Sequence, residues 1–176
     1  MAGKKGSVVV VGREIVFRRG QAGDLKEIVR LLADDPFTGE LEDAQGVATD
    51  SIPPVYRQAW DAVEASQDNV LLVAAREGEV IAVLQLTFIP SLTLRGSWRA
   101  QIEGVRVASP YRGQGVGTQL IEWATELARE KNCRLVQLTM DRRRERAGNF
   151  YRRLGFIATH EGFKKELDPQ DEIGSA

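Results

Sequence analysis

The stretch Gln101–Thr118 decides the fold class, and it reads QIEGVRV (101–107), ASPY (108–111) and RGQGVGT (112–118). Its first seven residues are typical of a β-strand, and the glycine at position 104 favours a β-bulge there. The last seven hold three glycines within five positions, and apolar residues at helical spacing follow. A strand, a glycine-rich loop and a helix are therefore predicted as one continuous unit.

The glycine-rich loop predicts an anion-binding site. Glycines let backbone N–H groups turn inward, and a helix that begins there adds the positive end of its dipole. Arg112 adds a cation at the mouth, which suits a diphosphate. The spacing of Gly113, Gly115 and Gly117 is neither the dinucleotide pattern nor the Walker loop, so NAD and ATP are not expected. The loop alone also fits an ordinary strand-to-helix turn, so neighbouring motifs must decide.

The flanking sequence predicts a mixed α/β sheet layered with helices. Hairpin signals combine with strand–helix–strand crossovers, and no internal repeat is present. The expected strands are 14–19, 70–76, 80–88, 97–107 and 135–140, with two final segments within 156–167 about Gly162. The expected helices start at Leu25, within 53–66, at Val116 and at Arg144.

Composition narrows the classes of function. A length of 176 residues fits one domain. Lys and Arg number 24 against 25 Asp and Glu, so no basic surface for nucleic acid is expected. The single cysteine, Cys133, cannot form an internal disulfide, and no apolar run approaches the roughly 20 residues of a membrane span. Residues 1–12 lack a secretory signal, so a cytoplasmic protein is expected.

Two motifs in order resemble the GNAT family of N-acetyltransferases. Arg112-x-x-Gly115-x-Gly117, after a Val-x-Val strand and a Pro-Tyr turn, is similar to the family's acetyl-CoA motif. Residues 150–156 (FYRRLGF) are similar to its Tyr-x-x-x-Gly-Phe motif, and residues 17–25 resemble its opening strand and helix. The resemblance implies an acyl-CoA N-acyltransferase fold over residues 14–167, with a central, mostly antiparallel sheet flanked by helices. Residues 1–13 and 168–176 lie outside it and are expected to be flexible tails.

The resemblance also implies where acetyl-CoA, the co-substrate, is bound. The backbone at Val105 and Val107 would pair with the pantetheine arm like an added strand, and the amides of 112–118 would hold the pyrophosphate. Residues 97–167 look closest to aminoalkylphosphonate N-acetyltransferases, whereas Arg144 departs from the Asn that many members carry. The implied cofactor-binding residues are Val105, Arg106, Val107, Arg112, Gly113, Gln114, Gly115, Val116, Gly117 and Thr118.

Acetyl transfer needs a base, because a primary amine is mostly protonated at neutral pH. Glu103 is our candidate, since it lies on the cofactor-pairing strand; the alternative is an ordinary solvated carboxylate. Tyr151 is the candidate partner of the CoA thiolate, with a packed helix aromatic as the alternative. The N–H of Val105 at the bulge would stabilise the oxyanion.

Other features leave alternatives open. Cys133 fits a buried or incidental thiol rather than a nucleophile. The lone His160 supports neither a triad nor a complete metal site, so no metal ligand is predicted, and the basic run 142–146 fits a solvated helix start. The acidic segment 34–50 and residues 90–96 are expected to frame the acceptor pocket. The expected partner is a small-molecule amine. A protein N-terminus or lysine as acceptor, a non-catalytic acyl-CoA sensor, and a homodimer through the last strands remain alternatives.

Overall fold

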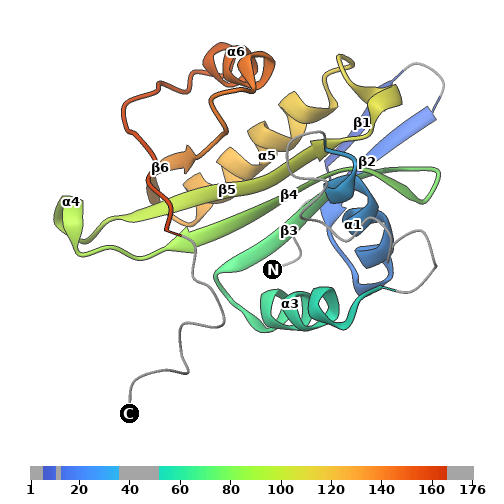
Figure 1. Ribbon diagram of the computed structural model, residues 1–176, viewed down its shortest axis with the longest axis horizontal. Helices are drawn as coiled ribbons and strands as arrows, with labels where there is room; N and C mark the ends of the chain where they lie inside the picture. The colour runs from blue at the N-terminus through green and yellow to red at the C-terminus, as the bar shows by residue number, and fades with distance from the viewer. Residues whose placement is uncertain (1–5, 11–12, 36–51, 166–176) are drawn as a thin grey trace. The chain divides into compact units, whose positions relative to one another are not determined.

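The computed structural model describes residues 6–10, 13–35 and 52–165, and the chain divides into two compact units, residues 1–138 and 139–176. The second unit holds helix α6 (Glu145–Arg153). The elements of the first unit are, in chain order, β1 (Gly6–Val10), β2 (Arg13–Arg19), η1 (Ala22–Asp24), α1 (Leu25–Ala33), α3 (Pro54–Ala65), β3 (Asn69–Arg76), β4 (Glu79–Ile89), α4 (Thr93–Gly96), β5 (Trp98–Val107), η2 (Ser109–Tyr111), α5 (Val116–Glu130) and β6 (Cys133–Leu138) (Figure 1).

The described strands form one six-stranded sheet in the order β1-β2-β3-β4-β5-β6. Every neighbouring pair is antiparallel except β5 and β6, which run parallel. A parallel pair needs a crossover connection, and α5 supplies it between β5 and β6. The predicted fold class, a mixed and mostly antiparallel sheet flanked by helices, is confirmed.

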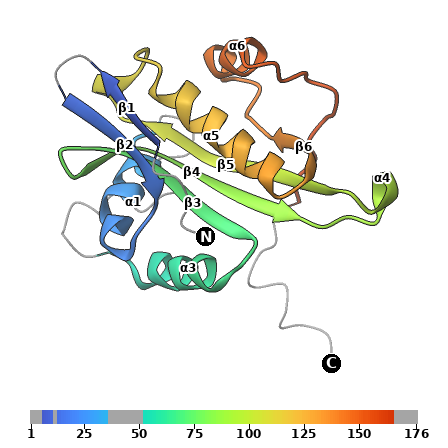
Figure 2. The same ribbon diagram turned by 180° about the vertical axis from the view of Figure 1, so that it is seen from behind.

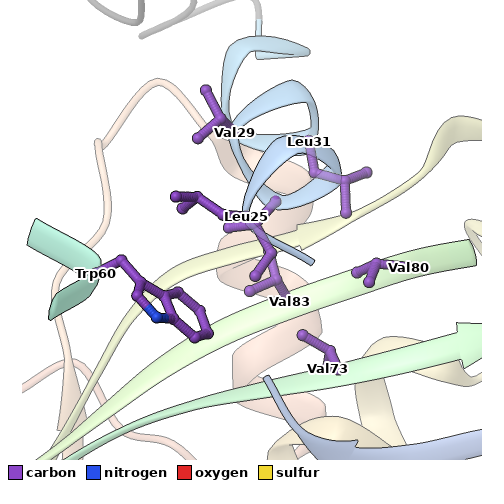
Figure 3. Packing of buried hydrophobic residues seen from close by; sticks show 8 residues of the cluster. Leu25, Val29, Leu31, Trp60, Val73, Val80 and Val83 are labelled. Carbon is purple, nitrogen blue, oxygen red and sulfur yellow. The ribbon is translucent and has the colours of Figure 1, made fainter. Parts of the chain in front are cut away.

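Helices cover both faces of the sheet, with α5 on one face and α1 and α3 on the other (Figures 1 and 2). The side chains of β5 alternate between the two faces of the sheet. Ala100 and Ile102 are fully buried on one face, and Gln101 and Glu103 point to the other. On the α1 and α3 face a hydrophobic cluster joins the two helices to strands β3 and β4 (Figure 3). It includes Leu25, Val29, Leu31, Trp60, Val73, Val80 and Val83.

Two predicted backbone features are confirmed. The β3–β4 hairpin turns through Glu77 (φ 53°) and Gly78 (φ 92°), as a tight turn with two positive φ angles requires. The β4–β5 register shifts opposite Gly104 (φ 60°), because Val83 pairs with Arg106 and Gln85 pairs with Glu103. Strand β5 thus carries one residue more than β4 at this point, which is a β-bulge.

The final strands are a correction. Residues 156–165 contain no strand, although two segments within 156–167 were expected. Most of these side chains are exposed, with Phe163 at 92%, and a strand persists only where a neighbour satisfies its backbone.

Near the start of the sequence, strand β1 lies within residues 1–13, which were expected to be a tail. Its valine-rich run forms a strand there because it pairs with β2. The expected loop 37–51 lies outside the described residues.

Candidate functional site

The end of β5 is paired on one side only. Its parallel pairing with β6 stops at Ile102 and Leu138, where β6 ends, whereas β5 continues to Val107 and pairs there with β4. Within the described part of the first unit, no strand covers the β6 side of residues 103–107. Such an edge can accept an extended chain as an added strand.

Glu103 lies at the start of this edge. Its side chain is exposed, and within the described residues its carboxylate makes no hydrogen bond or ion pair. The residue opposite it on β4 is Gln85, whose Nε2 donates to Asn69 Oδ1 at 3.2 Å. A carboxylate in this setting can take a proton directly or through a water molecule.

The glycine-rich loop leads directly into α5. Gly113 (φ 76°) and Gly115 (φ 83°) are left-handed, a conformation that disfavours any residue with a Cβ. Gly115 is the N-cap of α5, and the first intrahelical bond runs from Gln119 N–H to its carbonyl at 3.1 Å. The N–H groups of residues 116–118 precede that bond, and the first turn holds no acidic residue. This geometry can hold an anion.

Two side chains brace the loop against the end of β5. Arg112 donates from Nε to the Val107 carbonyl at 2.8 Å, and Gln114 donates from Nε2 to the Pro110 carbonyl at 2.7 Å. Arg112 also pairs with Asp34 at 3.4 Å, where both side chains are more than half exposed. Such an exposed pair contributes little to stability. Because more than half of the Arg112 side chain is exposed, its guanidinium is accessible at the mouth of the loop.

Arg106 has a structural contact that the sequence did not indicate. Its guanidinium forms an ion pair with Asp35 at the end of α1, and the Asp35 side chain is only 1% exposed. Arg106 also donates to the Val105 carbonyl at 3.0 Å. Because the side chain is held in this way, only the backbone of Arg106 remains for a cofactor.

Tyr151 belongs to the second unit, where it is half-buried on α6. Its ring centroid lies 5.2 Å from that of Phe150 and 5.8 Å from that of Phe156. Arg144 is the N-cap of the same helix, and exposed His160 contacts Thr159 Oγ1 at 2.7 Å. Each of these residues is therefore placed only within its own unit.

Cys133 begins β6 and is half-buried. Burial raises the pKa of its thiol against the smaller opposing effect of the Lys131 charge. The thiol form therefore dominates at neutral pH, whereas the nucleophilic form of a cysteine is the thiolate.

The site also includes polar residues that the sequence analysis missed. Gln137 Nε2 donates to Gln101 Oε1 at 2.8 Å across β5 and β6, and Thr87 Oγ1 donates to Asn69 Oδ1 at 2.6 Å across β3 and β4. These side chains share the sheet face of Glu103, because each pair is in register. The available signal was the polar alternation of Arg99, Gln101 and Glu103 along one strand.

The described residues contain neither a candidate membrane span nor a candidate metal site. None of their helices has the length and apolar character that a membrane span requires. No cluster of three or more His, Cys, Asp or Glu side chains in this part of the chain is arranged to hold a metal ion.

Known proteins resemble this chain in sequence and in fold. A curated relative, the aminoalkylphosphonate N-acetyltransferase of Salmonella typhimurium, is 36% identical over 95 residues, which cover 54% of this chain and 61% of that protein. The chain thus spans less than two thirds of that relative's length.

Two solved structures are also similar. One, described as a transcriptional regulator from Bacillus halodurans C-125, is 43% identical with a TM-score of 0.82, covering 87% of this chain and 99% of that one. A Trypanosoma brucei acetyltransferase is 26% identical with a TM-score of 0.68, over 87% of this chain and 99% of that one. Residues 26–156, more than half of the chain, match the model of the acetyltransferase (GNAT) family. The chain therefore belongs to the acetyltransferase (GNAT) family.

Proposed function

We propose that the protein transfers the acetyl group of acetyl-CoA to the primary amine of a small molecule. The observation that carries the proposal is the half-paired end of β5, which leads through the glycine-rich loop into the N-terminus of α5. The edge at Val105 and Val107 is suited to an extended pantetheine arm, and the N–H groups from Arg112 to Thr118 are suited to its pyrophosphate. Family membership supports the same assignment.

In the proposed reaction the amine attacks the thioester carbonyl directly. Glu103 takes a proton from the amine, the N–C bond forms, and the C–S bond breaks to release the CoA thiolate. Tyr151 is proposed to donate its hydroxyl proton to that thiolate, and the Val105 N–H is proposed to stabilise the oxyanion. The exposed position of Glu103 supports its access to a substrate or a bridging water.

The acceptor is proposed to be small and polar. The sheet face that carries Glu103 offers amide and hydroxyl groups from Asn69, Gln85, Thr87 and Gln101. The name of the Salmonella relative points to amines that also carry a phosphonate. The cytoplasm is the proposed location, because a chain with one cysteine needs no oxidising compartment.

A second candidate function is an acyl-CoA-responsive sensor without catalysis. It is favoured by one observation, that the 43% identical structure is described as a transcriptional regulator. A sensor would use the same β5 edge and glycine-rich loop, but it would not depend on the carboxylate of Glu103.

The test is a thiol-release assay with acetyl-CoA and a panel of amines: aminoalkylphosphonates, polyamines, amino acids, aminoglycosides and peptides. Removing a general base costs about 10²–10⁴ in rate, so Glu103→Gln should lower kcat by that factor. The variant should bind acetyl-CoA as the wild type does, because the exposed Glu103 carboxylate makes no hydrogen bond or ion pair within the described residues, so its replacement should leave the backbone of β5 in place. Acetyl-CoA binding without turnover on any amine would reject the enzyme in favour of the sensor.

A further inference from the structure

Arg99 is a half-buried cation for which the described structure shows no partner. It lies on β5, and the residues directly opposite it are Ile89 on β4 and Leu135 on β6, both apolar. Its Nε atom is fully buried without a hydrogen-bond acceptor, and among the described residues its guanidinium makes no ion pair.

The other half-buried arginines in the described part of the first unit have a partner for the guanidinium group, although the Nε atoms of Arg76 and Arg106 are also buried without an acceptor. Arg18 pairs with Asp24 and Arg106 pairs with Asp35, while the guanidinium of Arg76 lies over the Tyr111 ring at 5.6 Å. A buried donor without an acceptor is costly. Among these described arginines, Arg99 is the one whose guanidinium has neither an ion pair nor an aromatic ring beside it, as expected of a group whose partner is a ligand.

The position of Arg99 indicates what that ligand carries. Arg99, Gln101 and Glu103 alternate along β5, so their side chains leave the same face of the sheet. Successive residues of these three are about 7 Å apart along the strand. The Arg99 cation and the Glu103 carboxylate therefore lie on either side of Gln101. Gln101 accepts from Gln137 through its oxygen, which leaves its own NH₂ group as a donor.

We propose that Arg99 and Gln101 bind the anionic group of a compact zwitterionic acceptor, a phosphonate or a carboxylate, and that its amine meets Glu103. This inference rests on the proposed function and deepens it by naming the substrate class. Arg99 and Glu103 lie about 13 Å apart along the strand, and their side chains shorten that gap, so the acceptor has a short spacer. An Arg fork suits both phosphonate and carboxylate oxygens.

The test compares matched amines on Arg99→Gln and Arg99→Lys. The substrates are 2-aminoethylphosphonate, β-alanine and n-propylamine, which lacks the anion. Loss of a charge-assisted bond should lower kcat/KM of Arg99→Gln for an anionic amine by roughly 10- to 100-fold, with Lys recovering part of it. Activity with n-propylamine and the KM for acetyl-CoA should stay unchanged. Arg57→Gln, an exposed arginine on α3, is the control and should match the wild type.

The outcomes separate the two proposals. A lower kcat/KM of Arg99→Gln with either 2-aminoethylphosphonate or β-alanine supports the anion site, and the amine that is affected shows which anion the site binds. An equal loss with n-propylamine, or no loss with either anionic amine, overturns it. If the wild type acetylates no amine, the proposed function fails. The anion site is then tested separately, by calorimetric binding of the same two anionic amines in the presence of CoA. Binding that Arg99→Gln abolishes supports the site, and no binding to the wild type rejects it.

Discussion

Replacing Gly104 at the β-bulge should destabilise the protein through its backbone alone. A Cβ added at Gly104 would meet Leu32 Cδ2 at 3.6 Å, an ordinary contact, so Gly104→Ala creates no clash. The cost comes from φ 60°, which disfavours a residue with a Cβ by roughly 1–2 kcal/mol. Each kcal/mol lowers Tm by about 2–4 °C in a chain of this size, so the expected loss is about 2–8 °C.

The assay is thermal and urea unfolding of Gly104→Ala and Gly104→Asn, with thiol release as a second measurement. Asn tolerates the left-handed conformation and should lose clearly less than Ala. Gly23→Ala is the matched control, because Gly23 has open space around it and no positive φ, and it should change stability by less than about 0.5 kcal/mol. Equal losses for Ala and Asn at position 104, or wild-type stability of both, would refute the backbone argument.

Two ion pairs give further predictions. Arg106→Ala removes the cation that pairs with the buried Asp35 carboxylate, so urea unfolding should show a loss of about 3 kcal/mol, and an unchanged midpoint would contradict the pairing. Asp24 is the second case: burial alone would raise its pKa, but hydrogen bonds from Arg18 and the Gln21 N–H, with the Arg18 charge, lower it. A lowered pKa stabilises the fold above the ordinary value of 3.8, and the contribution disappears as the pH falls through the folded-state pKa. Asp24→Asn should therefore cost about 1–3 kcal/mol at neutral pH, and this difference should shrink between about pH 5 and pH 2; a constant difference would refute the linkage.

Structure that depends only on residues close together in the sequence was predicted correctly. The Glu77-Gly78 turn with its two strands, the bulge at Gly104, and the loop before Val116 all depend on neighbouring residues and were found. The family was found for the same reason, because both of its motifs are short and continuous.

Features that depend on distant pairing were missed or wrong. The expected strands in 156–167 failed within the described residues because a suitable composition does not supply a pairing partner. The Arg106–Asp35 pair and the Gln101–Gln137 pair join residues far apart in the chain, and only the register brings them together. The roles of Glu103 and Tyr151 stay predictions, since neither polarity nor exposure alone assigns a chemical step.

The order of the sheet has a kinetic consequence. Strands β3, β4 and β5 are consecutive in the chain and form an antiparallel meander, so their pairing closes only short loops. The β2–β3 and β5–β6 pairs each close over intervening helices and carry a larger entropic cost. We expect the meander, with Arg99 and Glu103 already aligned on it, to form in the folding transition state. Helix α5 and strand β6 would then dock after the transition state. Substitutions in α5 should therefore mainly change the unfolding rate.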